Sequence, residues 1–182
     1  PYALHFKAPE DWTVISNGPV SWEGDVASTA IDYPLSTYLV ALCAGPYHEV
    51  TDTWRGELTA HPEGKPAQKL EVPLGIYCRA SLAHALDAER LFTETKQGFD
   101  FYHRNFGFPY PFGKYDQIFV PEFNAGAMEN AGCVTIRDEY VFTSQATHYK
   151  YERRADTVLH ELAHMWFGDL VTMQWWDDLW LN

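Results

Sequence analysis

The first part of the chain alternates between apolar and polar positions in short runs, a pattern typical of β-strands. The stretch YALHFK alternates in this way, and the strand-like stretch TVIS runs into Asn17-Gly18, a dipeptide that favours a tight turn. The run TYLVALCAG, residues 37–45, is apolar throughout with aromatic and β-branched members, so we expect a well-buried strand. Two further strands are predicted in HEVTDTW and KLEVPLGIYCR, separated by the polar, Pro- and Gly-containing loop HPEGKPAQ.

The pattern changes to a helical period after Arg79. Apolar and aromatic side chains then recur at spacings of three and four residues from Ala88 to Phe106. We therefore predict an amphipathic helix of about six turns, with Ser81 as its N-cap and with Gly107 and Pro109 ending it. Its aromatic stripe is interpreted as core packing.

The rest of the chain mixes strands and helices. YPFGKYDQIFVPEF predicts a turn and a strand, NAGAMENAG a loop of small residues, and CVTIRDEYVF one or two strands. A second helix is expected from about Glu152 to Phe167, ended by Gly168, and a last helix near Asp177. A β-rich first part, residues 1–72, followed by a mixed second part, residues 73–182, indicates an α+β fold.

Composition and charge exclude several classes of function. The chain of 182 residues is 46% hydrophobic, which is enough for a packed core, and its net charge is -12. Nucleic acids and anionic membranes are bound by Lys- and Arg-rich surfaces, so we expect neither as a partner. The sequence has no apolar run of about eighteen residues and therefore no membrane span, and its first residues do not resemble a signal peptide.

The three cysteines, Cys43, Cys78 and Cys133, lie far apart and form no CxxC pair. A zinc site built on thiolates is therefore not expected. Buried free thiols suit a reducing compartment, so a cytoplasmic location is the expectation.

The stretch HELAH, residues 160–164, carries the strongest chemical signal. On the predicted helix His160 and His164 are four residues apart, so both imidazoles lie on one face and can bind one metal ion. Glu161 is rotated by about 100° from His160 and can reach a water molecule beside the metal without being a ligand. It would accept a proton from that water, because the metal lowers the pKa of water toward neutrality. The pattern favours zinc over a helix whose histidines are only solvated or buried.

A zinc site needs a third protein ligand, and the residues after His164 supply no obvious one. They contain neither Cys nor His. Asp169 stands beside the expected helix stop, and Asp177 and Asp178 are better placed to cap a helix than to bind a metal. The residues alone therefore leave the class of zinc protein open.

A second informative stretch is GAMEN, residues 126–130. Gly126 and Ala127 allow a backbone to approach a ligand closely. Glu129 follows in a predicted loop, where an acidic side chain is usually only solvated. Composition by itself therefore does not favour a ligand-binding role for Glu129.

Taken together, GAMEN, the HELAH-x-WFG stretch thirty residues later, and the following LVTM, WW and DLWLN closely resemble the aminopeptidase N family. This is the membrane alanyl aminopeptidase group of the gluzincin zinc metallopeptidases. The resemblance covers most of residues 73–182 and implies that they are the first part of a thermolysin-like zinc catalytic domain. Residues 1–72 fit only loosely, as the end of an N-terminal β domain. The chain does not begin with Met, and we expect it to be an internal fragment of a longer enzyme.

The resemblance implies a metal site residue by residue. His160 and His164 would bind one Zn2+ ion, and Glu161 would be the general base. In this family the third ligand is a Glu that follows the second His after eighteen intervening residues. Counted from His164, that ligand is position 183, directly after Asn182. The chain by itself is therefore expected to be inactive and to bind zinc weakly.

The resemblance also implies the substrate. Glu129 would hold the free α-amine of a peptide, and the rest of the substrate-binding loop would be Gly126, Ala127, Met128 and Asn130. A carboxylate at a fixed distance from zinc pairs with an ammonium group only when the scissile bond is the first one. The expected activity is therefore a zinc aminopeptidase that removes N-terminal amino acids from peptides.

Four positions depart from the family's pattern: Met165 replaces a frequent Gln, Asp169 a common Asn, Gln174 a common Glu, and Ala131 a frequent Trp. None of them is an expected ligand or the base. Three alternatives are a catalytically silent relative acting as a binding or scaffold module, a leukotriene-hydrolase-like enzyme with epoxide hydrolase and aminopeptidase activities, and an endoprotease. The intact HELAH stretch argues against the first, and Glu129 against the third.

Overall fold

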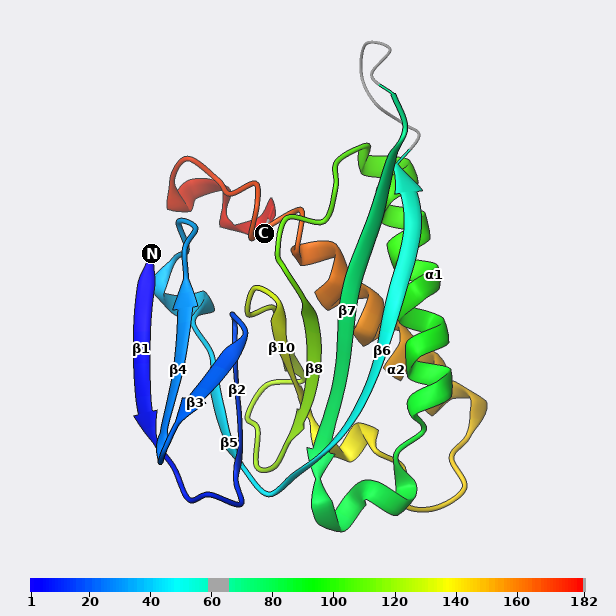
Figure 1. The fold of residues 1–182 in the computed structure, drawn as a ribbon. Helices are drawn as coiled ribbons and strands as arrows, with labels where there is room; N and C mark the ends of the chain where they lie inside the picture. The colour runs from blue at the N-terminus through cyan, green and yellow to red at the C-terminus, as the bar shows by residue number, and fades with distance from the viewer. Residues whose placement is uncertain (59–65, 182) are drawn as a thin grey trace.

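The computed structural model describes residues 1–58 and 66–181, which form three β-sheets and two long helices (Figure 1). The first part of the chain contributes two small antiparallel sheets. One has the strand order β1-β4-β3 and the other pairs β2 with β5. Their bounds are β1 (Tyr2–Lys7), β2 (Thr13–Ser16), β3 (Val20–Glu23), β4 (Val26–Ile31) and β5 (Leu42–Gly45).

The largest sheet has five strands in the order β6-β7-β8-β10-β9. Its strands are β6 (Tyr47–Leu58), β7 (Gln68–Arg79), β8 (Tyr115–Val120), β9 (Ala127–Met128) and β10 (Cys133–Arg137). The central strands β7, β8 and β10 run parallel, whereas β6 and β9 pair antiparallel at the two ends. The short strand β9, which belongs to the GAMEN stretch, is therefore an edge strand.

The helices α1 (Ala88–Phe106) and α2 (His148–His164) pack together on one face of this sheet (Figure 1). Leu91, Phe99 and Leu162 of these helices share one core with Ile76, Phe119 and other residues of the sheet. The opposite face of the sheet packs against β2 and β5, where Ile15 and Cys43 share a second buried cluster with Ile118 and Cys133. Both faces of the central strands are thus covered, which explains why β8 is buried almost throughout.

Short 3-10 helices complete the chain: Thr37–Leu39, Ala80–Ala85, Asp138–Tyr140 and Trp176–Leu181. The predicted α+β class is confirmed. The predicted boundary between residues 72 and 73 lies within β7, and the division into two domains stays a prediction.

The prediction of the first helix is confirmed at its C-terminal end and wrong at its N-terminal end. Gly107 adopts a left-handed φ of 64° and donates its N–H to the carbonyl of His103, which ends α1 as expected. Ser81 is not the N-cap, because residues 80–85 form a 3-10 turn and Leu86 is extended. Leu82 and Leu86 pack against the core from this turn, so tertiary packing overrides the local helical period.

The apolar run at residues 37–45 is a strand only in its second half. Thr37–Leu39 forms a 3-10 helix, and β5 alternates between exposed and buried side chains. The reason is that β5 pairs only with β2 and covers the large sheet with one of its faces, so Cys43 is buried while Leu42 is exposed.

The second helix is displaced toward the N-terminus relative to its prediction. It begins after Thr147, whose side chain accepts a hydrogen bond from the Lys150 N–H, and it ends at His164, before Gly168. The last predicted helix near Asp177 is a 3-10 helix. Residues 61–65 of the predicted HPEGKPAQ loop lie outside the described residues.

The three cysteines are buried and unpaired, as expected. The cytoplasmic location stays a prediction. None of the described helices is long and apolar enough to cross a membrane.

Candidate active site

The two histidines of HELAH lie at the C-terminal end of α2, and their rings converge. The Nε2 atoms of His160 and His164 are 3.1 Å apart. The Nδ1 atom of His164 lies 3.0 Å from the backbone carbonyl of Phe167 and donates its proton there, since a carbonyl can only accept. The Nε2 atom of His164 therefore carries a lone pair directed toward His160, as a metal ligand requires.

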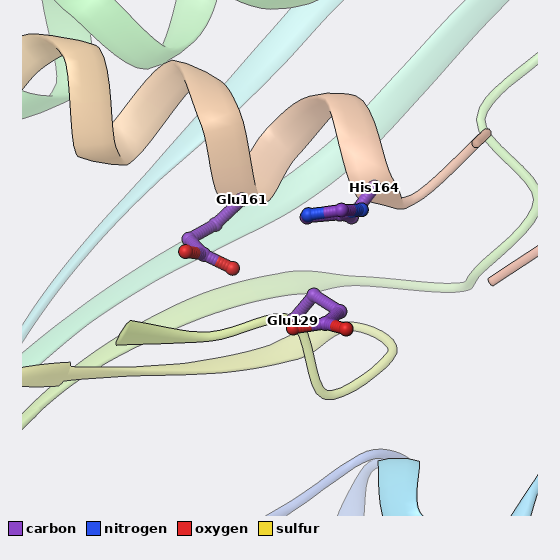
Figure 2. Close-up of side chains that lie close together, drawn as sticks. All are labelled: Glu129, Glu161 and His164. Carbon is purple, nitrogen blue, oxygen red and sulfur yellow. The ribbon is translucent and has the colours of Figure 1, made fainter. Parts of the chain in front are cut away.

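Glu161 and Glu129 complete the group. Figure 2 shows Glu161 and His164 projecting from α2 toward Glu129, which follows β9 on the opposite side. One ligand atom from each of Glu129, Glu161 and His164 lies within 4.8 Å of the others, an arrangement that can hold a metal ion. Residues that are more than thirty positions apart in sequence thus meet in one small volume.

The surroundings of Glu161 raise the pKa of its carboxyl group. Its side chain is buried, and the Oε2 atom has no hydrogen-bond partner. Burial, followed by the negative charge of Glu129, raises the pKa of Glu161 to about 8. Two carboxylates this close, one of them unpartnered, favour a cation between them.

Close packing of the two helices sets the position of α2. Gly98 of α1 faces α2, and a Cβ atom added there would lie 2.6 Å from Leu159 and 2.8 Å from Leu162. The absence of a side chain at Gly98 therefore allows the HELAH turn to approach α1. Leu162 is fully buried between the helices, which directs Glu161 and His164 toward β9.

The other predicted substrate-binding residues differ in their surroundings. Ala127 and Met128 form β9 and pair with β10, while the carbonyl of Gly126 accepts the Arg137 N–H. Gly126 is exposed, and a Cβ atom there would meet nothing within 4 Å, so space is open beside its backbone. Asn130 is buried and donates to the hydroxyl of Thr135, so its side chain holds the loop together.

A cavity of about 750 Å3 opens beside Glu129. Its other walls are Ser36, Thr37, Tyr38, Thr172, Met173, Gln174, Trp175, Trp176 and Leu179. The sequence contains no signal that would have joined residues 36–38 to this site, because they come from the first part of the chain.

A slightly larger cavity, of about 800 Å3, lies on the other face of the sheet, beside β2, β3, β6 and β7. None of the predicted site residues lines it. Its acidic groups already have partners, since Glu49 accepts from Tyr77, Asp116 from Lys114, and Asp52 from Lys96. The cavity beside Glu129 is therefore the better candidate site, despite its smaller size.

Two further polar groups near the site were not predicted to be part of it. Asp169 has both carboxylate oxygens buried without a hydrogen-bond partner, and burial, followed by the charges of Glu129 and Glu161, raises its pKa to about 8. The hydroxyl of Tyr115 is also buried without a partner, and burial, with a smaller contribution from Glu161, raises its pKa. Tyr115 stands in no motif that marks it, and Asp169 stands in the sequence only as a weak candidate for the third metal ligand.

A model of the Peptidase family M1 domain matches residues 91–182, which include both GAMEN and HELAH. The chain belongs to peptidase family M1. This confirms the resemblance inferred from the motifs. The matched segment contains Glu129 and the two histidines and glutamate of HELAH, which the structure brings together.

Several similar proteins are named aminopeptidases. The chain is 58% identical over 177 residues to aminopeptidase N of Streptomyces lividans. The aligned region covers 97% of this chain and 19% of that protein. It is 35% identical over 189 residues to glutamyl aminopeptidase of Sus scrofa, covering 100% of this chain and 18% of that protein. It is 36% identical over 187 residues to probable aminopeptidase 2 of Sulfurisphaera tokodaii, covering 100% of this chain and 22% of that protein. The chain spans about a fifth of the length of these relatives.

Proposed function

We propose that the enzyme containing this chain is a zinc-dependent aminopeptidase that removes N-terminal amino acids from peptides. The observation that carries the proposal is the convergence of Glu129, Glu161 and His164 at the end of α2. Membership of family M1 and the names of the relatives support it. Within the enzyme, residues 73–182 would be the first part of a thermolysin-like catalytic domain and residues 1–72 the end of an N-terminal β domain.

The histidine pair fits zinc. Two nitrogens bound to one tetrahedral zinc ion at about 2.0–2.1 Å are roughly 3.3 Å apart, and the two Nε2 atoms here are 3.1 Å apart. His160 and His164 would be ligands, and the third would be a Glu at position 183, directly after Asn182. When bound, zinc would polarise the carbonyl of the scissile bond and make a nearby water more acidic.

Glu161 would act as the general base. Its unpartnered Oε2 atom is free to take a proton from the attacking water and then to give it to the leaving nitrogen of the peptide. Without a bound cation, burial and the charge of Glu129 favour the protonated form of Glu161. A bound cation would oppose this effect and lower the pKa of Glu161 toward its ordinary value.

Glu129 would bind the α-amine. Its carboxylate lies across from Glu161, so an ammonium group placed beside it relieves the repulsion between the two acids. The backbone of Gly126 and of Ala127, the first residue of the edge strand β9, would line the cleft. A substrate anchored by its amine at Glu129 presents its first peptide bond to Glu161, which makes the enzyme an exopeptidase.

The proposal is tested by Glu129→Gln in the full-length enzyme. Two substrates are compared: an alanyl arylamide, and the lactoyl arylamide in which a hydroxyl replaces the ammonium group. We expect kcat/KM to fall at least about tenfold more on the alanyl substrate, because only that substrate carries the charge that Glu129 binds. Glu122→Gln, in the exposed loop before β9, is the matched control and should leave kcat/KM unchanged on both substrates. Equal losses on both substrates would contradict the anchoring role.

A further inference from the structure

The position of Glu129 depends on the short segment 130–132, which connects it to β10. The carbonyl of Asn130 accepts the Cys133 N–H over 2.8 Å. The carbonyl of Gly132 accepts from the Asp116 N–H and from Lys114 Nζ, each over 3.1 Å. These contacts hold the segment to β8 and β10, but none of them involves Ala131.

Asn17 holds Ala131, and it comes from the other part of the molecule. Its Nδ2 atom donates to the carbonyl of Ala131 over 2.9 Å and to the carbonyl of Leu39 over 2.8 Å. Its Oδ1 atom accepts the Ala41 N–H over 2.8 Å. Asn17 is 3% exposed, and 114 positions separate it from Ala131. One buried amide thus ties the β2–β5 region to the segment after Glu129.

The backbone around this contact has no spare room. Gly132 has a φ of 66°, and a Cβ atom there would lie 3.0 Å from the carbonyl oxygen of Lys114 and 3.3 Å from that of Asn17. At Gly18, directly after Asn17, a Cβ atom would lie 2.5 Å from the carbonyl oxygen of Ala30. Asn17 therefore cannot shift relative to Ala131 without moving one of these backbones.

The chemistry of the side chain matches this place. An asparagine amide donates two hydrogen bonds and accepts at its oxygen, which is what two carbonyls and one N–H require. An aspartate would place an oxygen against two carbonyls, and an alanine would leave all three backbone groups without this partner.

We propose that Asn17 is a positioning residue for the reaction, because it fixes Ala131 and thereby the place of Glu129 opposite Glu161 and His164. This inference rests on the proposed anchoring of the substrate amine by Glu129. The β-rich first part of the chain would then contribute to the amine site through Asn17, although Asn17 itself does not contact the substrate.

The test is Asn17→Ala in the full-length enzyme, with the ratio of kcat/KM on the alanyl arylamide to kcat/KM on the lactoyl arylamide as the readout. We expect this ratio to fall about tenfold, with most of the change in KM for the alanyl substrate and with unchanged zinc content. The matched control is Ser16→Ala. It removes the adjacent buried hydrogen bond from Ser16 Oγ to the carbonyl of Ala41, which does not involve the segment after Glu129. It should lower stability and leave the ratio unchanged.

The outcomes separate this inference from the function on which it rests. A ratio that stays unchanged in Asn17→Ala while stability falls, as in Ser16→Ala, overturns the positioning role. If Asn17→Ala does not fold, Asn17→Ser takes its place, because a hydroxyl can still donate to one of the two carbonyls. Its ratio should fall by a smaller factor. An unchanged ratio in Asn17→Ser would overturn the inference. If Glu129→Gln measured in parallel leaves the ratio unchanged, the anchoring role of Glu129 is wrong and the inference fails with it.

Discussion

Arg154 in α2 donates a hydrogen bond from Nη2 to Oδ2 of Asp87, the residue directly before α1, over 2.9 Å. The side chain of Arg154 is 2% exposed, and its guanidinium lies 5.2 Å from the ring centroids of Phe142 and Tyr151. The helix that carries HELAH is therefore joined to α1 by a buried charge as well as by apolar packing.

This pair predicts an order of stabilities. Asp87→Ala leaves a buried guanidinium unpaired and should cost about 1–3 kcal/mol of unfolding free energy. This is less than the roughly 3–5 kcal/mol that is usual for a fully buried pair, because Asp87 is partly exposed. Arg154→Met removes the charge and keeps most of the volume, so it should cost less. Urea unfolding of both variants measures this, with Asp156→Ala, which breaks the exposed pair with Arg153, as a control near zero. The reverse order would show that packing of the Arg154 side chain outweighs its charge.

Removal of the metal should abolish activity and lower the melting temperature. Zinc bound by His160 and His164 would stabilise the folded state by mass action, so a chelator should remove that stabilisation and added zinc should restore it. His164→Ala in the full-length enzyme should lose zinc, as measured by atomic emission, and should no longer respond to the chelator. His148→Ala, at the exposed start of α2, is the control and should keep its zinc. Full zinc occupancy in His164→Ala would exclude this histidine as a ligand.

Glu161→Gln should separate metal binding from catalysis. The substitution keeps the shape of the side chain but removes the group that accepts the proton, so kcat should fall by roughly 10²–10⁴-fold. Zinc content should stay unchanged, because Glu161 is not a ligand in the proposed site. Near-normal kcat in a zinc-loaded Glu161→Gln enzyme would assign the base to another residue.

Asp169→Asn should stabilise the enzyme when zinc has been removed. Both oxygens of Asp169 are buried without partners, and its pKa is raised from 3.8 to about 8, first by burial. The folded state thus binds this proton more tightly than the unfolded state does, and stability is lost as the pH rises from 3.8 to about 8. Asparagine carries no charge, so the gain in melting temperature should be small near pH 4 and should increase up to about pH 8. A gain that does not depend on pH, or one matched by the exposed control Asp11→Asn, would contradict this cause.

Much of the local structure follows from the sequence because its causes are local. The end of α1 at Gly107 needs only a residue that tolerates the left-handed conformation. The shared direction of His160 and His164 needs only a helix and a spacing of four, and their Nε2 atoms do converge. The errors arise where a distant partner decides. Strand β5 is shorter than its apolar run because only four residues of that run pair with β2, and its burial alternates because one face covers the large sheet.

The sequence by itself determined the secondary structure in outline, the HELAH and GAMEN motifs, and through them the family. Only the tertiary structure decided that Glu129 lies within reach of Glu161 and His164, and that Asn17 holds the segment behind Glu129. Helical period and turn chemistry act over a few residues and can be read along the chain. The distance between β9 and α2 depends instead on strand order, on the buried contact at Gly98 and on a hydrogen bond across 114 positions, none of which leaves a periodic trace in the sequence.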